Sequence, residues 1–191
     1  MLNVVAWGGM LFLLLINASP AMCHPTCNDI NSPRRIWIEI DSQILNALFC
    51  VTGFGLIPWR FRDLWYLLKW RCGGRRDALE RLAGIHEAWF RLEPGVDVEK
   101  TEQEEETTAS PTKTWKLDYV IWLYCWNTFF QCCLSGFMWG MDRYERPAWS
   151  TGLFVALACL VAGLAGGMVW WETRKVKRVE GEGEKEREGG E

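Results

Sequence analysis

The chain has 191 residues, of which 49% are hydrophobic and 24% are charged, and its formal net charge is −3. Its apolar residues gather in four blocks and do not recur at the spacing of a soluble core, which argues against one ordinary soluble domain. Eight cysteines do not indicate a disulfide scaffold, because five of them fall inside the apolar blocks, where a thiol behaves as a small hydrophobic group.

The first block, residues 1–16, would be about 24 Å long as a helix, which is short for a membrane span. It predicts a first transmembrane helix or a signal anchor, or a span whose beginning is missing; a signal peptide is disfavoured because the block has no Lys or Arg. Residues 17–37 follow as a predicted lumenal loop. There Cys23 and Cys27 are disulfide candidates, with two free thiols as the alternative. A metal site that includes His24 is disfavoured because it would lack a fourth ligand.

The second block has the clearest length and charge pattern. Residues 42–59 are 18 positions without a charge and cover about 27 Å as a helix, close to the thickness of the hydrocarbon core, so 38–59 predicts transmembrane helix 2. Basic residues follow directly, and they are predicted to lie on the cytoplasmic side and to contact anionic lipid headgroups. They are Arg60, Arg62, Lys69, Arg71, Arg75 and Arg76.

Three segments are predicted to lie outside the membrane. Residues 60–92 alternate apolar and charged positions at helical spacing, which predicts cytoplasmic amphipathic helices lying in the interface. Residues 93–114 carry seven acidic residues against two Lys, so they predict a disordered acidic linker. Residues 172–191 are charged and of low complexity, which predicts a disordered cytoplasmic tail.

The remaining blocks predict transmembrane helix 3 over 115–141 and transmembrane helix 4 over 151–171, joined by a lumenal loop over 142–150. Of 21 Lys and Arg, 17 fall on the segments assigned to the cytoplasm. Many of the 13 Trp lie near block ends, as in an aromatic belt. The expected fold class is therefore an all-α integral membrane protein with four transmembrane helices, the first short or truncated, and a cytoplasmic interfacial amphipathic helix.

Polar side chains recur at helical spacing in predicted helices 2 and 3. Such stripes should face protein or water, because unpaired polar groups are costly in lipid. Interhelical hydrogen bonding is the favoured interpretation, and a polar pathway for an ion or small solute is the alternative. The stripe residues are Glu39, Gln43, Asn46, Asn127, Gln131 and Ser135.

A second group is a predicted lumenal charge cluster. Glu39 and Asp41 lie at the start of helix 2, while Arg143 and Arg146 lie in the loop after helix 3. If the helices form one bundle, these charges share a level at the interface and can pair. Arg34 and Arg35, in the predicted loop just before helix 2, are rival partners for the same acids.

No catalytic signature is recognisable, since the chain has no phosphate-binding glycine loop, no HExxH and no GxSxG, and only two His. No catalytic residue, metal ligand or cofactor is therefore predicted. The basic patch after helix 2 alternates with Trp and Leu beside a span, which favours lipid headgroups over nucleic acid.

Three strings, IWIEIDSQILNALFCVTGFGLIPWRFRDLWYLLKWR, LAGIHEAWFRL and WKLDYVIWLYCWNTFFQCCLSGFMWGMDRYERPAWSTGLF, carry a family resemblance. The chain resembles a fungal family of multipass membrane proteins catalogued as domain of unknown function 2985. The resemblance implies four membrane helices and a variable cytoplasmic linker, and it supplies no catalytic residues. A looser likeness to placenta-specific-8-like proteins carries no metal role here, because their CCxxxxCPC signature is absent.

These patterns predict a non-enzymatic multipass protein of uncharacterised molecular function. The favoured function is that of a structural or interaction protein at a lipid surface, with the bilayer, anionic headgroups and a membrane protein as partners and no nucleic acid. The alternative is a small channel or transporter that uses the polar stripes. Neither the plasma membrane nor an endomembrane is preferred by the sequence.

Overall fold

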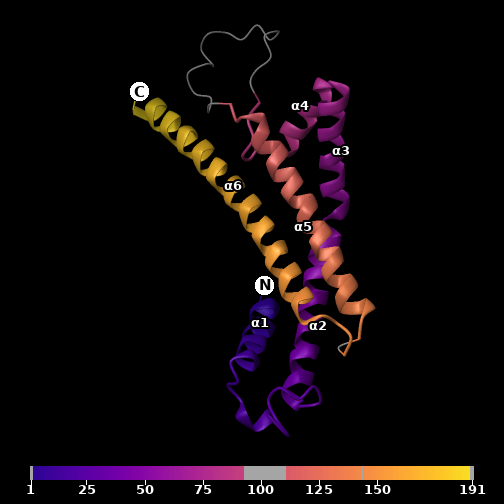
Figure 1. Ribbon diagram of the computed structural model, residues 1–191. Helices are drawn as coiled ribbons and strands as arrows, with labels where there is room; N and C mark the ends of the chain where they lie inside the picture. The colour runs from indigo at the N-terminus through magenta and orange to yellow at the C-terminus, as the bar shows by residue number, and fades with distance from the viewer. Residues whose placement is uncertain (1, 93–110, 143, 190–191) are drawn as a thin grey trace. The chain divides into compact units, whose positions relative to one another are not determined.

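The computed structural model of the protein describes residues 2–92, 111–142 and 144–189. Within these ranges the chain is all-helical, with six α-helices and one short 3-10 helix (Figure 1). The elements are α1 (Leu2–Leu15), η1 (Pro20–Met22), α2 (Pro33–Gly55), α3 (Ile57–Gly73), α4 (Arg76–Ile85), α5 (Thr114–Gly140) and α6 (Ala148–Gly189).

Local sequence explains where several helices begin and end. Ser32 caps α2, because its hydroxyl accepts a hydrogen bond from the Arg35 amide at 3.3 Å, and Pro33 follows at a position where no amide hydrogen is needed. Pro58 lacks an amide hydrogen, which favours the break between α2 and α3. Gly74 separates α3 from α4 with a φ of +60°, a conformation that glycine adopts without a steric penalty.

The prediction of four membrane-spanning helices is wrong. Among the described residues one helix, over Trp149–Val179 within α6, is long and apolar enough to cross a membrane by itself, and an 18-residue stretch of it has a mean hydropathy of 2.3. α2 has 23 residues but is not apolar enough by itself, and α3 has 17 residues; the two meet both requirements only when they are counted together across their break. α1 has 14 residues. α5 has 27 residues and is long enough, but its Trp, Tyr and amide side chains lower its mean hydropathy below that of a membrane span.

Other predicted boundaries also shift. The amphipathic pattern expected to continue to residue 92 ends as a helix at Ile85, where His86 follows as the C-cap. Residues 93–110 of the predicted linker lie outside the described residues, whereas Thr112 is buried and hydrogen-bonded. The predicted disordered tail is helical as far as Gly189, because α6 continues past its apolar part without a proline.

The chain divides into two compact units, of which the first comprises Met1–Ile57 and Thr128–Ala158. In this unit α1 runs antiparallel beside α2 (Figure 1). Arg34 holds the two helices at their connected ends, since its guanidinium donates to the carbonyls of Leu14, Leu15 and Cys27 at 2.8–3.1 Å. The bonds to Leu14 and Leu15 satisfy carbonyls at the end of α1 that have no intrahelical partner.

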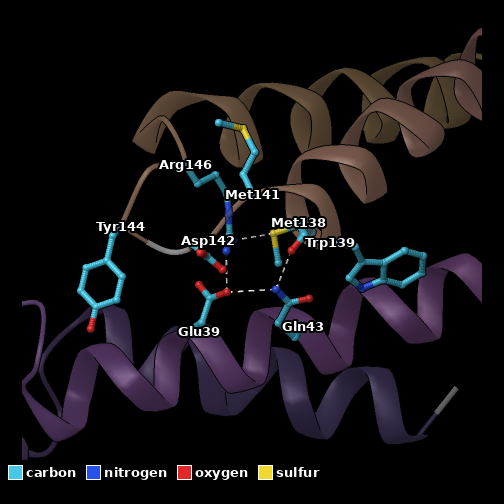
Figure 2. Close-up of a pocket in the computed structure, with 8 residues that line it drawn as sticks. All are labelled: Glu39, Gln43, Met138, Trp139, Met141, Asp142, Tyr144 and Arg146. Atoms are coloured by element: carbon cyan, nitrogen blue, oxygen red, sulfur yellow. Dashed lines mark hydrogen bonds and ion pairs between the residues drawn. The ribbon is translucent and has the colours of Figure 1, made fainter.

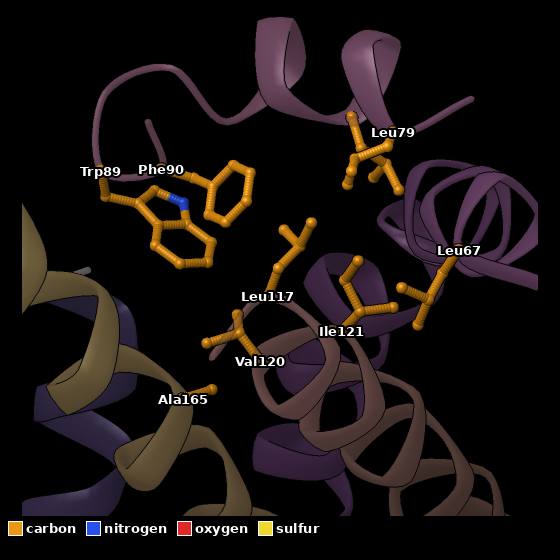
Figure 3. Packing of buried hydrophobic residues seen from close by; sticks show 9 residues of the cluster. Leu67, Leu79, Trp89, Phe90, Leu117, Val120, Ile121 and Ala165 are labelled. Atoms are coloured by element: carbon orange, nitrogen blue, oxygen red, sulfur yellow. The ribbon is translucent and has the colours of Figure 1, made fainter. Parts of the chain in front are cut away.

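The second unit comprises Pro58–Asn127 and Cys159–Glu191 and contains a hydrophobic core. Its centre is formed by residues of α3, α4, α5 and α6 together with the turn after α4 (Figure 3). Leu82 and Leu117 are completely buried, and Phe90 is 1% exposed. The core residues are Leu67, Leu79, Leu82, Trp89, Phe90, Leu117, Val120, Ile121 and Ala165.

Candidate functional site

In the first unit the predicted polar stripes of α2 and α5 face each other. The amide of Gln43 donates to the Met138 carbonyl at 2.8 Å, and the Cys50 thiol lies 2.9 Å from the Ser135 hydroxyl. Gln131 donates to the Cys50 sulfur at 3.5 Å. Gln43, Gln131 and Ser135 therefore bond across the two helices, an arrangement that supplies polar partners inside the protein. Asn46 accepts from Cys50 of its own helix, and its buried amide nitrogen has no partner among the described residues.

A close approach of backbone and side chain accompanies these bonds. A Cβ placed on Gly53 would lie 3.2 Å from Cγ of Gln131, whereas one placed on Gly55 would meet nothing within 4 Å. Gly53 thus gives Gln131 room to reach Cys50, and a larger residue there would displace the amide.

Asn127 of the predicted stripe belongs to the second unit and has a different partner. Arg60 donates to its side-chain oxygen at 2.8 Å and also to the Tyr124 carbonyl at 3.4 Å. The Arg60 guanidinium lies 5.4 Å from the centre of the Tyr124 ring. Arg60, which the sequence assigned to lipid headgroups, is therefore engaged within the protein.

The predicted charge cluster contains one close ion pair among the described residues. Arg146 Nη2 lies 2.6 Å from Glu39 Oε1, and Arg146 Nη1 donates to the Met138 sulfur at 2.9 Å. Asp41 does not join this pair: it is fully buried, and neither of its oxygens has a hydrogen-bond partner in the described part of the chain. Arg143 lies outside the described residues.

A pocket of about 600 Å³ surrounds the Glu39–Arg146 pair (Figure 2). It is lined by α2, the end of α5 and the loop that follows α5. Its walls contain two carboxylates, from Glu39 and Asp142, two aromatic rings, from Trp139 and Tyr144, two methionines, one amide and the Arg146 guanidinium. The guanidinium of Arg146 points toward Glu39, and the Asp142 carboxylate points into the same space (Figure 2).

The predicted headgroup residues of α3 have acidic and aromatic neighbours inside the second unit. Arg62 pairs with Asp63 at 2.8 Å, Arg71 pairs with Asp118, and Lys69 lies 5.1 Å from the centre of the Trp65 ring. At the following turn, Arg75 lies 4.0 Å from Asp77, and Arg76 is exposed.

Asp63 makes a contact that the sequence patterns did not indicate. Its Oδ2 lies 3.3 Å from His86 Nε2, which joins α3 to the turn after α4. Burial of the Asp63 carboxyl favours its neutral form, but the neighbouring His86 ring and the hydrogen bonds from Arg62 outweigh burial and lower the pKa of Asp63. No local spacing in the sequence links Asp63 to His86, which lie 23 positions apart.

A buried ion pair joins α5 to α6 in the second unit and was also missed. Lys116 Nζ lies 2.6 Å from Glu172 Oε1, and the two side chains are 16% and 6% exposed. Lys175 approaches the same oxygen at 3.6 Å from an exposed position. The sequence signal available was only a lone Glu directly after an apolar block.

Cationic side chains cover tryptophan rings just beyond the apolar part of α6. Arg174 lies 3.9 Å from the Trp170 ring centre, and Lys175 lies 5.8 Å from the Trp171 ring centre. Both tryptophans are more than half exposed. Exposed indoles beside cations are typical of the boundary between hydrocarbon and headgroups.

The cysteines divide into a bonded pair and free thiols. Cys23 and Cys27 form a disulfide. The other six cysteines are free, and Cys72, Cys132 and Cys159 are exposed. Over the described residues no group of three or more His, Cys, Asp or Glu side chains could hold a metal ion.

The family model described as "Protein of unknown function (DUF2985)" matches residues 1–70. The match covers α1, α2 and most of α3, so the resemblance to this family is supported for that part of the chain. It does not bear on fungal origin or on the number of membrane spans. No curated protein matches the chain, and no solved structure matches it.

Proposed function

We propose that the protein is a membrane-anchored interaction protein without catalytic activity, held in a bilayer by the apolar part of α6. The observation that carries this proposal is the combination of high hydropathy and low burial in α6. Only 17% of its 18-residue apolar window is buried. The core helix of a soluble protein would be mostly buried, and a signal sequence would lie near the N-terminus.

The ends of this helix also suit a bilayer. Trp149 precedes the apolar stretch and Trp170 and Trp171 end it, and all three are more than half exposed. Arg174, Lys175, Lys177 and Arg178 follow Trp170 and Trp171, so this end attracts anionic headgroups. The partners in this proposal are the hydrocarbon core, anionic lipids and a membrane protein.

The proposal is tested by placing charges in the apolar stretch. Leu160 and Leu164 are about half exposed, so Leu160→Lys with Leu164→Lys removes no core residue. Each lysine costs about 2.5–3.5 kcal/mol near the centre of a membrane helix. We expect the wild type to resist extraction with alkaline carbonate and the double variant to be extracted.

The matched control is Ile85→Lys, which places a charge at an exposed apolar residue at the end of α4 and should leave membrane retention unchanged. Helix content measured by circular dichroism checks that both variants remain folded. A wild-type chain that carbonate extracts, or a double variant retained as firmly as wild type, would overturn the proposal.

A further inference from the structure

The pocket around the Glu39–Arg146 pair has an uneven charge that favours a ligand carrying both signs. Glu39 and Arg146 neutralise each other at 2.6 Å, so Asp142 leaves the wall with an excess negative charge. A cationic group is therefore favoured beside Asp142. Because the carboxylates of Asp142 and Glu39 converge on one space, they present several acceptor oxygens to it (Figure 2).

The same wall offers a donor for a negative group. Arg146 Nε is buried and has no acceptor among the described residues, and the Arg146 side chain is 9% exposed. Buried donors normally have a partner, so an anionic oxygen of a ligand fits this position. Donor and acceptor sites thus lie side by side, as a zwitterion requires.

The kind of ammonium group follows from the aromatic rings. Recognition of a quaternary ammonium uses rings that surround the cation. Here Trp139 and Tyr144 lie on opposite sides of the carboxylates and do not enclose a common space (Figure 2). A primary ammonium, which donates hydrogen bonds to carboxylates, matches this wall better than a quaternary one.

The source of such a group follows from the position of the pocket along the chain. Its last lining residue, Arg146, precedes Trp149, the first residue of the candidate span, by three positions. If α6 crosses a bilayer, as proposed above, this loop lies at the level of the headgroups. Two methionines and the exposed Trp139 ring add apolar surface for the glycerol region of a lipid.

We propose that this pocket binds the headgroup of phosphatidylethanolamine, with the primary ammonium between Asp142 and Glu39 and the phosphate beside Arg146. The inference rests on the membrane anchoring by α6. It adds a specific lipid to the general attraction of the basic end of α6 for anionic headgroups.

The test is isothermal titration calorimetry of the full chain in a maltoside detergent, with short-chain lipids as probes. We expect dihexanoyl phosphatidylethanolamine to bind saturably, and the phosphatidylcholine and phosphatidylglycerol analogues to bind at least about tenfold more weakly, since neither can donate N–H bonds to the carboxylates. Free phosphoethanolamine should also bind more weakly, because it lacks the apolar contacts.

Asp142→Asn removes the excess charge and keeps the side-chain shape, so it should weaken binding of the ethanolamine lipid about tenfold. Glu145→Gln is the matched control, because Glu145 is exposed in the same loop and does not line the pocket; it should leave the affinity unchanged. Equal binding of the choline lipid, equal binding of free phosphoethanolamine, or an equal effect of the two variants would overturn the inference. Carbonate extraction of membranes that contain the same variants, before they are solubilised, separates this failure from failure of the membrane anchor.

Discussion

The carboxylate of Asp63 joins α3 to the turn that follows α4. It lies 3.3 Å from His86 and 2.8 Å from Arg62, and its side chain is 13% exposed. Burial favours the neutral carboxyl, but the neighbouring His86 and Arg62 outweigh burial and lower the pKa of Asp63. A pKa below the unfolded value means that the ionised carboxylate stabilises the fold above about pH 4, and that this contribution is lost as the pH falls further.

Replacing Asp63 with Asn should lower the free energy of unfolding by about 1.5 kcal/mol at pH 7, because a charged hydrogen-bond acceptor is removed. The difference from wild type should shrink as the pH falls from about 4 to about 2. Thermal unfolding of both proteins, followed by circular dichroism at several pH values between about 2 and 7, measures this difference in stability. Asp77→Asn is the control, since Asp77 is exposed and 4.0 Å from Arg75, and its effect should stay below about 0.5 kcal/mol. A loss for Asp63→Asn that is constant with pH would contradict the assignment.

At the scale of the elements, the close contact between α2 and α5 has a glycine, Gly53, opposite Gln131. A side chain on Gly53 would press on Gln131 at 3.2 Å, so Gly53→Leu should destabilise the first unit by about 1–3 kcal/mol. Gly55→Leu is matched in chemistry and lies two residues away in open space, so it should be close to neutral or slightly stabilising. Chemical unfolding in detergent compares the two variants. Equal losses would show that the contact between α2 and α5 does not select glycine.

The contact of α5 with α6 in the second unit depends on a buried ion pair. Removing the Lys116 charge with Lys116→Met leaves the Glu172 carboxylate paired with the exposed Lys175 alone among the described residues, so stability should fall by about 3 kcal/mol. Lys175→Met should cost less than about 1 kcal/mol because Lys175 is 57% exposed. The double variant Lys116→Met with Glu172→Met should recover part of the loss, since no unpaired charge stays buried. Additive losses in this thermodynamic cycle would argue against direct coupling of the two residues.

At the scale of the whole molecule, the basic end of α6 should select anionic lipids. Each cation near a membrane surface contributes roughly 1 kcal/mol to binding of an acidic headgroup. We therefore expect Arg174→Gln with Lys175→Gln to reduce the phosphatidylglycerol that copurifies from mixed nanodiscs about fivefold or more, as measured by mass spectrometry of the lipids.

The control for this measurement is Arg81→Gln, an exposed substitution on α4 that should leave lipid retention unchanged. Raising the salt concentration should reduce retention by wild type more than by the double variant, because it screens the charges that the variant lacks. If the amount of copurified phosphatidylglycerol changes neither with the double substitution nor with salt, α6 does not select headgroups by charge.

Local composition was enough to predict the helical class and the apolar block that lies within α6. Both depend on properties of neighbouring residues, namely the length of an uncharged run and the period of apolar positions. The length of an uncharged run, used alone, overestimated the number of membrane spans, because a run such as that of α5 contains polar groups and is not apolar throughout. Its aromatic and amide groups lower its hydropathy, and Gln131 has partners inside the protein.

Which polar groups meet was decided by tertiary packing. Arg60 and Asn127 are 67 residues apart, Lys116 and Glu172 are 56 apart, and Glu39 and Arg146 are 107 apart. No period or spacing in the sequence links such positions, since their distance depends on how the helices pack within each unit. The basic residues after α2 suit lipid headgroups by composition. Tertiary packing nevertheless gives two of them partners within the protein: Arg60 contacts Asn127 in a half-buried position, and Arg71 contacts Asp118 at the surface.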